Sequence, residues 1–148
     1  MPVLKDHLRP EGALVKVVIG WSAEAVRQQR MTLGPVPPAE TVMALIDTGA
    51  EITCVDESVA LKLRLPFGGT AFANLPAHGG VSFQSLHDAC VIIPHPSGKT
   101  RHQLLLSSMS VLEIPLASLG YEAILGRDIL GRCSFLYHGP SGKFRLSY

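Results

Sequence analysis

The sequence lacks any long apolar run, although 47% of its 148 residues are hydrophobic. No stretch approaches the roughly 18 apolar residues that a membrane span requires, and the N-terminus has no apolar core of a secretory signal. Charged residues make up only 17% of the chain, with a formal net charge of +1 and no acidic or basic block. We therefore expect a soluble, cytoplasmic protein that does not bind nucleic acid.

Cysteine is also scarce, and the three cysteines, Cys54, Cys90 and Cys133, are widely spaced. Their number is odd and no CxxC motif occurs, so we interpret them as buried reduced thiols rather than disulfides or zinc ligands. The six histidines are scattered along the chain. None is interpreted as a metal ligand, and we expect no cofactor.

The length fits one domain with a substantial core, and no internal boundary or repeat is visible. We therefore expect a single domain over residues 1–148. The mean hydropathy of +0.26 is high for a small domain. Such a chain can bury more than its own core, for instance in an oligomer interface.

Short strand signals dominate the chain, and turn residues separate them. The pattern predicts an all-β, barrel-like domain with one or two short helices. We interpret the polar, Pro-rich segment 22–40 as a long loop or the outer part of a hairpin, with at most a helical turn. Strands are expected at 13–21, 41–47, 51–56, 70–75, 80–94, 102–115 and 121–125, helices at 57–65 and just after Gly126, and a hairpin at 134–148.

The most informative stretch is "MALIDTGAEITCVD", in which an apolar strand runs into Asp47, Thr48 and Gly49. Gly49 allows a tight turn and a close approach by a ligand. An aspartate at the rim of an apolar core is costly unless the site needs it. Taken alone, the tripeptide is better explained by an Asx turn, in which the side chain bonds the backbone two residues on.

A second motif, "AILGRDIL", lies far downstream at 123–130. The segments "ALIDTGAEITCVDESVALKLRL" and "YEAILGRDIL", in this order and spacing, resemble the two most recognisable segments of the retropepsin-like aspartic protease family. The resemblance covers about residues 12–148 and is closer to cellular, bacterial-type members than to viral ones. It implies a closed β-barrel with a flap hairpin.

The resemblance also implies roles for individual residues. Asp47 would be the catalytic carboxylate. Thr48 and Gly49 would support the active-site loops, Thr48 through a hydroxyl network between them. Gly49 and Ala50 would line the floor under the substrate backbone, and Ile124 would wall the substrate pocket.

Two further expectations come from the same resemblance. Glu51 would form an ion pair with Arg127. The strands beside "PAHGG" would form the flap, with Ala77, His78 and Gly79 contacting substrate at its tip. His78 departs from the family's Gly-rich, apolar tip, and it is either an exposed loop histidine or a contact to the substrate or the catalytic pair.

Peptide hydrolysis by this class uses one carboxylate as a general base and a second, protonated one to polarise the scissile carbonyl. The remaining aspartates do not repeat the strand-Asp-turn arrangement of Asp47. A two-fold axis supplies the second carboxylate, because it brings the same residue of two subunits together. We therefore expect a homodimer, with the hairpin 134–148 as a candidate part of its interface. The other aspartates are Asp6, Asp56, Asp88 and Asp128.

The function expected is an aspartic endopeptidase that cleaves peptide or protein substrates. A second hypothesis keeps the same fold as a peptide-binding or dimerisation module with little or no proteolysis. A third, a structural β-barrel with a fortuitous Asx turn, leaves the paired motifs unexplained.

Overall fold

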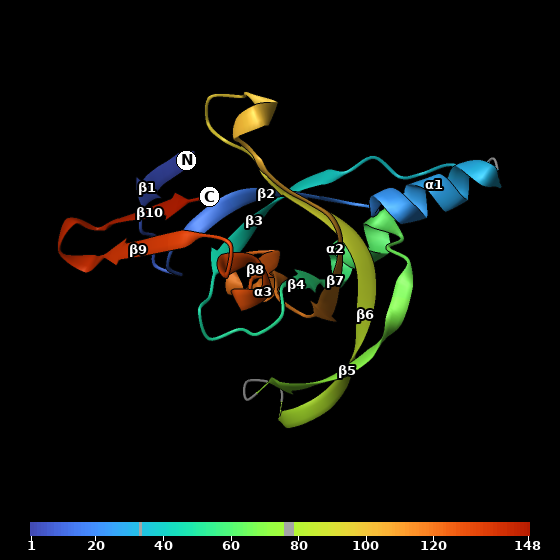
Figure 1. Cartoon of the computed structure of the whole chain (residues 1–148). Coiled ribbons are helices and arrows are strands. Elements are labelled where there is room, and N and C mark those ends of the chain that lie inside the picture. Colours follow the sequence, from blue (N-terminus) through green and yellow to red (C-terminus); the bar gives the residue numbers. More distant parts are fainter. Residues whose placement is uncertain (33, 76–78) are drawn as a thin grey trace.

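In the computed structural model, which describes residues 1–32, 34–75 and 79–148, six strands of the described chain form a closed barrel (Figure 1). The order around the barrel is β2-β3-β8-β4-β7-β6, and β6 closes it by pairing with β2. The all-β barrel predicted from the sequence is confirmed. These strands are β2 (Leu14–Gly20), β3 (Glu40–Ile46), β4 (Cys54–Asp56), β6 (Gly80–Ile93), β7 (Leu104–Ile114) and β8 (Ala123–Leu125).

The barrel core is built from alternate residues of these strands, as expected for a sheet with one buried face. Val17, Val91, Val111 and Leu125 are completely buried in it. Two short helices pack against this core: α2 (Glu57–Leu63), which Asp56 caps, and α3 (Arg127–Leu130). No helix in the described residues is long and apolar enough to span a bilayer.

A separate three-stranded sheet joins the two ends of the chain, in the order β1-β10-β9. We call it the terminal sheet; it contains β1 (Val3–His7), β9 (Ser134–His138) and β10 (Lys143–Ser147). The hairpin β9–β10 was predicted. The polar strand β1 was not, because its order depends on pairing with β10 at the other end of the chain. Phe144 and Leu146 of β10, on the inner face of the terminal sheet, are buried in the barrel core.

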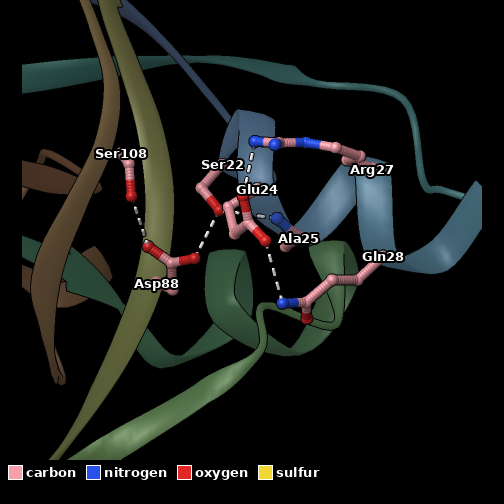
Figure 2. A network of polar contacts seen from close by, with 7 residues as sticks. All are labelled: Ser22, Glu24, Ala25, Arg27, Gln28, Asp88 and Ser108. Carbon is pink, nitrogen blue, oxygen red and sulfur yellow. Dashed lines mark hydrogen bonds and ion pairs between the residues drawn. The ribbon is translucent and has the colours of Figure 1, made fainter.

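Segment 22–40 contains more helix than the sequence indicated, because α1 spans Ala23–Met31. The Ser22 hydroxyl caps this helix by accepting from the Ala25 N–H at 3.1 Å. Ser22 also donates to the carboxylate of Asp88 on β6, which accepts a second bond from Ser108 at 3.2 Å (Figure 2). The helix is thus fixed by a contact between residues far apart in sequence.

A long hairpin of β5 (Phe67–Leu75) and β6 projects beyond the barrel at the bottom of Figure 1. It occupies the position where the sequence predicted a flap. The predicted tip residues Ala77 and His78 lie outside the described residues. Gly79 and Gly80 both have positive φ angles, +92° and +107°, which favour glycine.

Candidate active site

Asp47 lies directly after β3, at the end of a parallel strand pair. Strands β3 and β8 run side by side, with Ile46 opposite Leu125, and the Asp47 N–H donates to the Leu125 carbonyl at 3.1 Å. The chain then turns sharply, and the Ala50 N–H donates back to the Asp47 carbonyl at 3.2 Å. The carboxylate therefore lies at the rim of the barrel and is half-buried.

The turn itself orients the carboxylate. Oδ1 of Asp47 accepts the Gly49 N–H at 2.8 Å, which is the contact of an Asx turn. A Cβ at Gly49 would lie 3.1 Å from the same oxygen, so glycine keeps this approach open. Oδ2 accepts no hydrogen bond from the described residues. The Asx turn and a catalytic role are therefore compatible uses of the same geometry.

Arg127, at the start of α3, holds the Asp47 loop through the loop's backbone. Its N–H donates to the Ala50 carbonyl at 2.9 Å, and its guanidinium donates to the Thr48 carbonyl at 3.0 Å. In the described chain Glu51 and Arg127 form no ion pair. Both side chains are exposed. Glu51 contacts α3 through its backbone carbonyl, which accepts the Asp128 N–H at 3.3 Å. The sequence predicted that Arg127 pairs with the Glu51 side chain, whereas its guanidinium binds the Thr48 carbonyl.

Thr53 and Asp128 form a side-chain link between the two motifs. The Thr53 hydroxyl donates to Asp128 Oδ1 at 2.7 Å, and the Thr53 N–H donates to Oδ2 at 2.9 Å. The same hydroxyl accepts the Gly126 N–H at 3.1 Å, and Thr53 is only 1% exposed. A Cβ at Gly126 would lie 2.6 Å from the Ile52 carbonyl carbon. The backbones at Gly126 and Ile52 are therefore packed too closely for any side chain at position 126.

Thr53 was not predicted as a site residue, and Asp128 was expected only as part of a short helix. A polar signal existed, since Thr53 interrupts an apolar run and Asp128 opens a short helix. Nothing in the sequence alone paired residues 75 positions apart.

An apolar wall lies beside Asp47 and continues onto the projecting hairpin. Ile124 belongs to a small buried cluster with Cys54, Leu112, Ile114 and Leu116. Ala50 packs against this cluster from the Asp47 loop. Ala71, Ala73 and Leu75 pack against it from β5. The predicted substrate-contacting residues Ala50 and Ile124 are thus brought together. Gly79 is exposed, on the far part of the hairpin.

Burial keeps two ionisable groups near Asp47, Cys54 and Tyr121, neutral. Burial, with the negative charges of Asp128 and Asp47, raises the pKa of the Cys54 thiol to about 12. Burial and the charge of Asp47 also raise the pKa of Tyr121. A neutral thiol is a poor nucleophile. The Asp47 carboxylate, and not the Cys54 thiol, is therefore the candidate reactive group here. Cys90 and Cys133 are half-buried, and all three thiols are free.

No family model matches the chain, and no curated protein matches it. Among solved structures, it is similar to the crystal structure of a retropepsin-like aspartic protease from Rickettsia conorii. The TM-score is 0.56 at 12% sequence identity, over 97% of this chain and 89% of the other. The chain therefore has the retropepsin-like fold.

Proposed function

We propose that the protein is an aspartic endopeptidase that acts as a homodimer, with Asp47 of each subunit forming the catalytic pair. The observation that carries this proposal is the placement of Asp47. Its carboxylate ends a buried strand at the rim of a retropepsin-like barrel, and the turn at Gly49 orients it beside the apolar wall.

The state of the other aspartates supports a second copy as the source of the second carboxylate. Asp56 caps α2 and accepts the Leu116 and Ala117 N–H groups. Asp88 is bonded to two serines, and Asp128 to Thr53. Asp6 is exposed on β1 and bonds its neighbour's backbone. Each has a local partner, and none shares the rim position of Asp47.

In the proposed mechanism the two carboxyl groups share one proton, because two such groups in contact cannot both ionise. The ionised group removes a proton from water, and the water oxygen attacks the scissile carbonyl carbon. The protonated group donates to the carbonyl oxygen. The tetrahedral intermediate then breaks its C–N bond, and the leaving nitrogen takes up a proton from the pair.

The substrate proposed is an extended peptide bound between the Asp47 loop and the β5–β6 hairpin, which would act as the flap. Backbone contacts would come from Gly49 and Ala50, and apolar side chains would rest on the wall at Ile124. In the dimer the Thr48 hydroxyls would link the two loops. Gly79, on the far part of this hairpin, would contact the peptide.

Cleavage of a peptide library between pH 4 and 7 tests the catalytic role. Asp47→Asn is expected to lower the rate about 10²–10⁴-fold, as removal of a general acid–base group does. Asp6→Asn, which removes an exposed carboxylate elsewhere, is the matched control and should leave the rate unchanged. Absence of cleavage by the unaltered chain, or equal cleavage by Asp47→Asn, overturns the proposal. Peptide binding without cleavage would then favour the binding-module hypothesis.

Sedimentation and subunit mixing test the shared pair. Adding excess Asp47→Asn chain to the unaltered chain should lower the activity more than buffer dilution does, because mixed dimers hold one carboxylate. A monomer that cleaves at the same concentration would contradict the shared pair while leaving Asp47 as a catalytic residue.

A further inference from the structure

A cavity of about 560 Å³ lies where the end of β2, α1, α2 and the Pro-rich segment meet. Cavities of this size receive small ligands and the ends of peptides. Figure 1 shows α1 and α2 on the side of the molecule away from the terminal sheet, so a dimer formed through that sheet would leave the cavity open. We call it the Trp21 cavity; its lining includes Trp21, Pro35, Pro37, Pro38, Lys62 and Arg64.

The apolar part of the Trp21 cavity is held in place before any ligand arrives. The indole of Trp21 is half-buried, and its Nε1–H donates to the Leu63 carbonyl at 2.7 Å, which fixes the orientation of the ring. The proline rings of segment 35–38 are rigid side chains that lose no rotamer freedom on binding. An aromatic ring packs well against such surfaces. The lining therefore suits a flat apolar group, and its order lowers the entropic cost of binding.

Arg64 is the uncompensated charge of the Trp21 cavity. Lys62 is paired with Glu40, whose Oε1 lies 2.9 Å from Nζ of the lysine. Arg64 is exposed and forms no ion pair with any residue that the structure describes. None of the described lining residues is acidic. A guanidinium binds a carboxylate through two parallel hydrogen bonds, so the cavity combines an apolar lining with one free anion-binding group.

The backbone of Arg64 indicates that this side chain is not there for local stability. Arg64 ends α2 in the left-handed conformation, with φ +48°, and it is the one non-glycine residue with positive φ in the described chain. Glycine or asparagine usually occupies this position. A cation near a helix C-terminus is favourable, but Lys62 in the last turn already supplies one. Residues kept in such a conformation at a local cost cluster at functional sites.

We propose that the Trp21 cavity binds an aromatic carboxylate. The ring would lie against Trp21 and the prolines, and Arg64 would hold the carboxylate. A free small aromatic acid and the C-terminal aromatic residue of a peptide share this chemistry. The site is separate from Asp47, so the proposal does not depend on proteolysis.

Other ligands fit the Trp21 cavity less well. Nucleic acids bind through several phosphate contacts, whereas Arg64 is the single uncompensated cation of the described lining. Proline-rich peptides bind grooves lined by aromatic side chains, and Trp21 is the one aromatic residue among the described lining residues. An aliphatic acid would satisfy Arg64 but would not stack on the indole.

Tryptophan fluorescence tests the proposal directly, because Trp21 is the only tryptophan of the chain and its emission reports on this cavity alone. Titration with 3-phenylpropionate or with acetyl-Gly-Gly-Phe should change the emission and reach saturation. The corresponding amides keep the ring and lose the carboxylate, and they should bind at least about tenfold more weakly. Tighter binding of the small acid would identify a small-molecule site, and tighter binding of the peptide would identify a site for peptide C-termini.

Arg64→Gly separates binding from folding. It removes the guanidinium and places the favoured residue at a positive φ, so it should weaken binding of both acids about tenfold or more without lowering the melting temperature. Arg64→Lys keeps the charge but not the two parallel hydrogen bonds, and should weaken binding less. The matched control is Arg101→Gln, at an exposed arginine in the turn before β7, which should bind as the parent does. Asp47→Asn should also bind as the parent does.

Four results would overturn the proposal. An emission that neither acid changes would show that the cavity does not bind this chemistry. Equal binding of acids and amides would remove the role of the carboxylate. Equal weakening by Arg64→Gly and Arg101→Gln would place the effect in the overall charge and not at Arg64. Weaker binding by Asp47→Asn would move the ligand to the candidate active site. A chain that cleaves no peptide would leave each of these outcomes as informative as before.

Discussion

The loop that holds Asp47 and the hairpin that faces it are held in different ways. The loop, residues 47–53, is tied to Gly126, Arg127 and Asp128 by backbone bonds and by the buried Thr53 side chain. The outer part of the hairpin has no such links within residues 67–75 and 79–85: there, residues 80–85 pair only with β5, and β5 pairs only with β6. Two of its phenylalanines, Phe72 and Phe83, remain 65% and 64% exposed.

This difference separates two requirements of the proposed enzyme. A reacting carboxylate must be held within a fraction of an ångström, which rigid elements and supporting hydrogen bonds achieve. A cover over the substrate must admit and release a peptide, and segments of low local stability serve such motions. Substitutions in the Asp47 loop contacts should therefore cost folding free energy, whereas substitutions on the outer hairpin should cost little.

The largest effect is expected from Asp128→Ala. It removes the bonds to the Thr53 hydroxyl, the Thr53 N–H and the Ile129 N–H, and it leaves the buried hydroxyl without its acceptor. Hydrogen bonds to charged groups contribute more than neutral ones. We expect the free energy of unfolding to fall by about 2–4 kcal/mol, measured by urea denaturation.

Asp128→Asn should lose less, because one amide oxygen can still accept from the Thr53 hydroxyl. Asp6→Ala, at an exposed carboxylate on β1, is the control and should stay within about 0.5 kcal/mol. A double-mutant cycle with Thr53→Val should show strong non-additivity. Independent, additive losses would mean that the two residues do not act as one link.

A smaller, pH-dependent effect is expected at Asp56, which connects β4 to α2 and to the segment after β7. Burial opposes ionisation there. Hydrogen bonds from the Ser58 hydroxyl and from the Leu116, Ala117 and Ser58 N–H groups outweigh it and lower the pKa of Asp56. A lowered folded-state pKa stabilises the fold above the unfolded pKa, and this contribution is lost as the pH falls through the folded pKa.

Asp56→Asn should therefore destabilise the protein by about 1–2 kcal/mol at pH 7 and by less near pH 3. The measurement is urea denaturation of both chains at several pH values. Glu57→Gln, one residue along and exposed, is the control. A constant difference between parent and Asp56→Asn across this range would show that the charge of Asp56 contributes nothing.

The sequence was sufficient for the barrel strands and for the turn at Asp47, because both depend on local patterns. Alternating or continuous apolar runs mark strands, and a strand followed by Asp-Thr-Gly marks the turn. Each feature that it missed depends on a long-range contact. Helix α1 is fixed by Ser22 against Asp88, 66 positions away, and β1 is ordered by β10.

The Glu51–Arg127 expectation failed for a related reason. The resemblance implied an ion pair between Glu51 and Arg127, but a guanidinium has five N–H donors and backbone carbonyls compete for them. In the fold the Thr48 carbonyl lies within reach of Arg127, at 3.0 Å. Which oxygen accepts from the Arg127 guanidinium depends on the geometry of the Asp47 loop, and composition and spacing do not determine that geometry.

The smallest effect on stability is expected from Phe72→Ser with Phe83→Ser on the outer hairpin. The two rings lie opposite one another in register, with centroids 3.7 Å apart, but both are largely exposed. Aromatic pairs contribute about 0.5–1.5 kcal/mol beyond buried area, so we expect a loss of about 1 kcal/mol or less. Ala71→Ser with Ala73→Ser, on the half-buried inner face, is the contrasting pair. A loss from the outer pair equal to that of Asp128→Ala would mean that the hairpin is as firmly held as the Asp47 loop, and its proposed movement over a substrate would lose its structural basis.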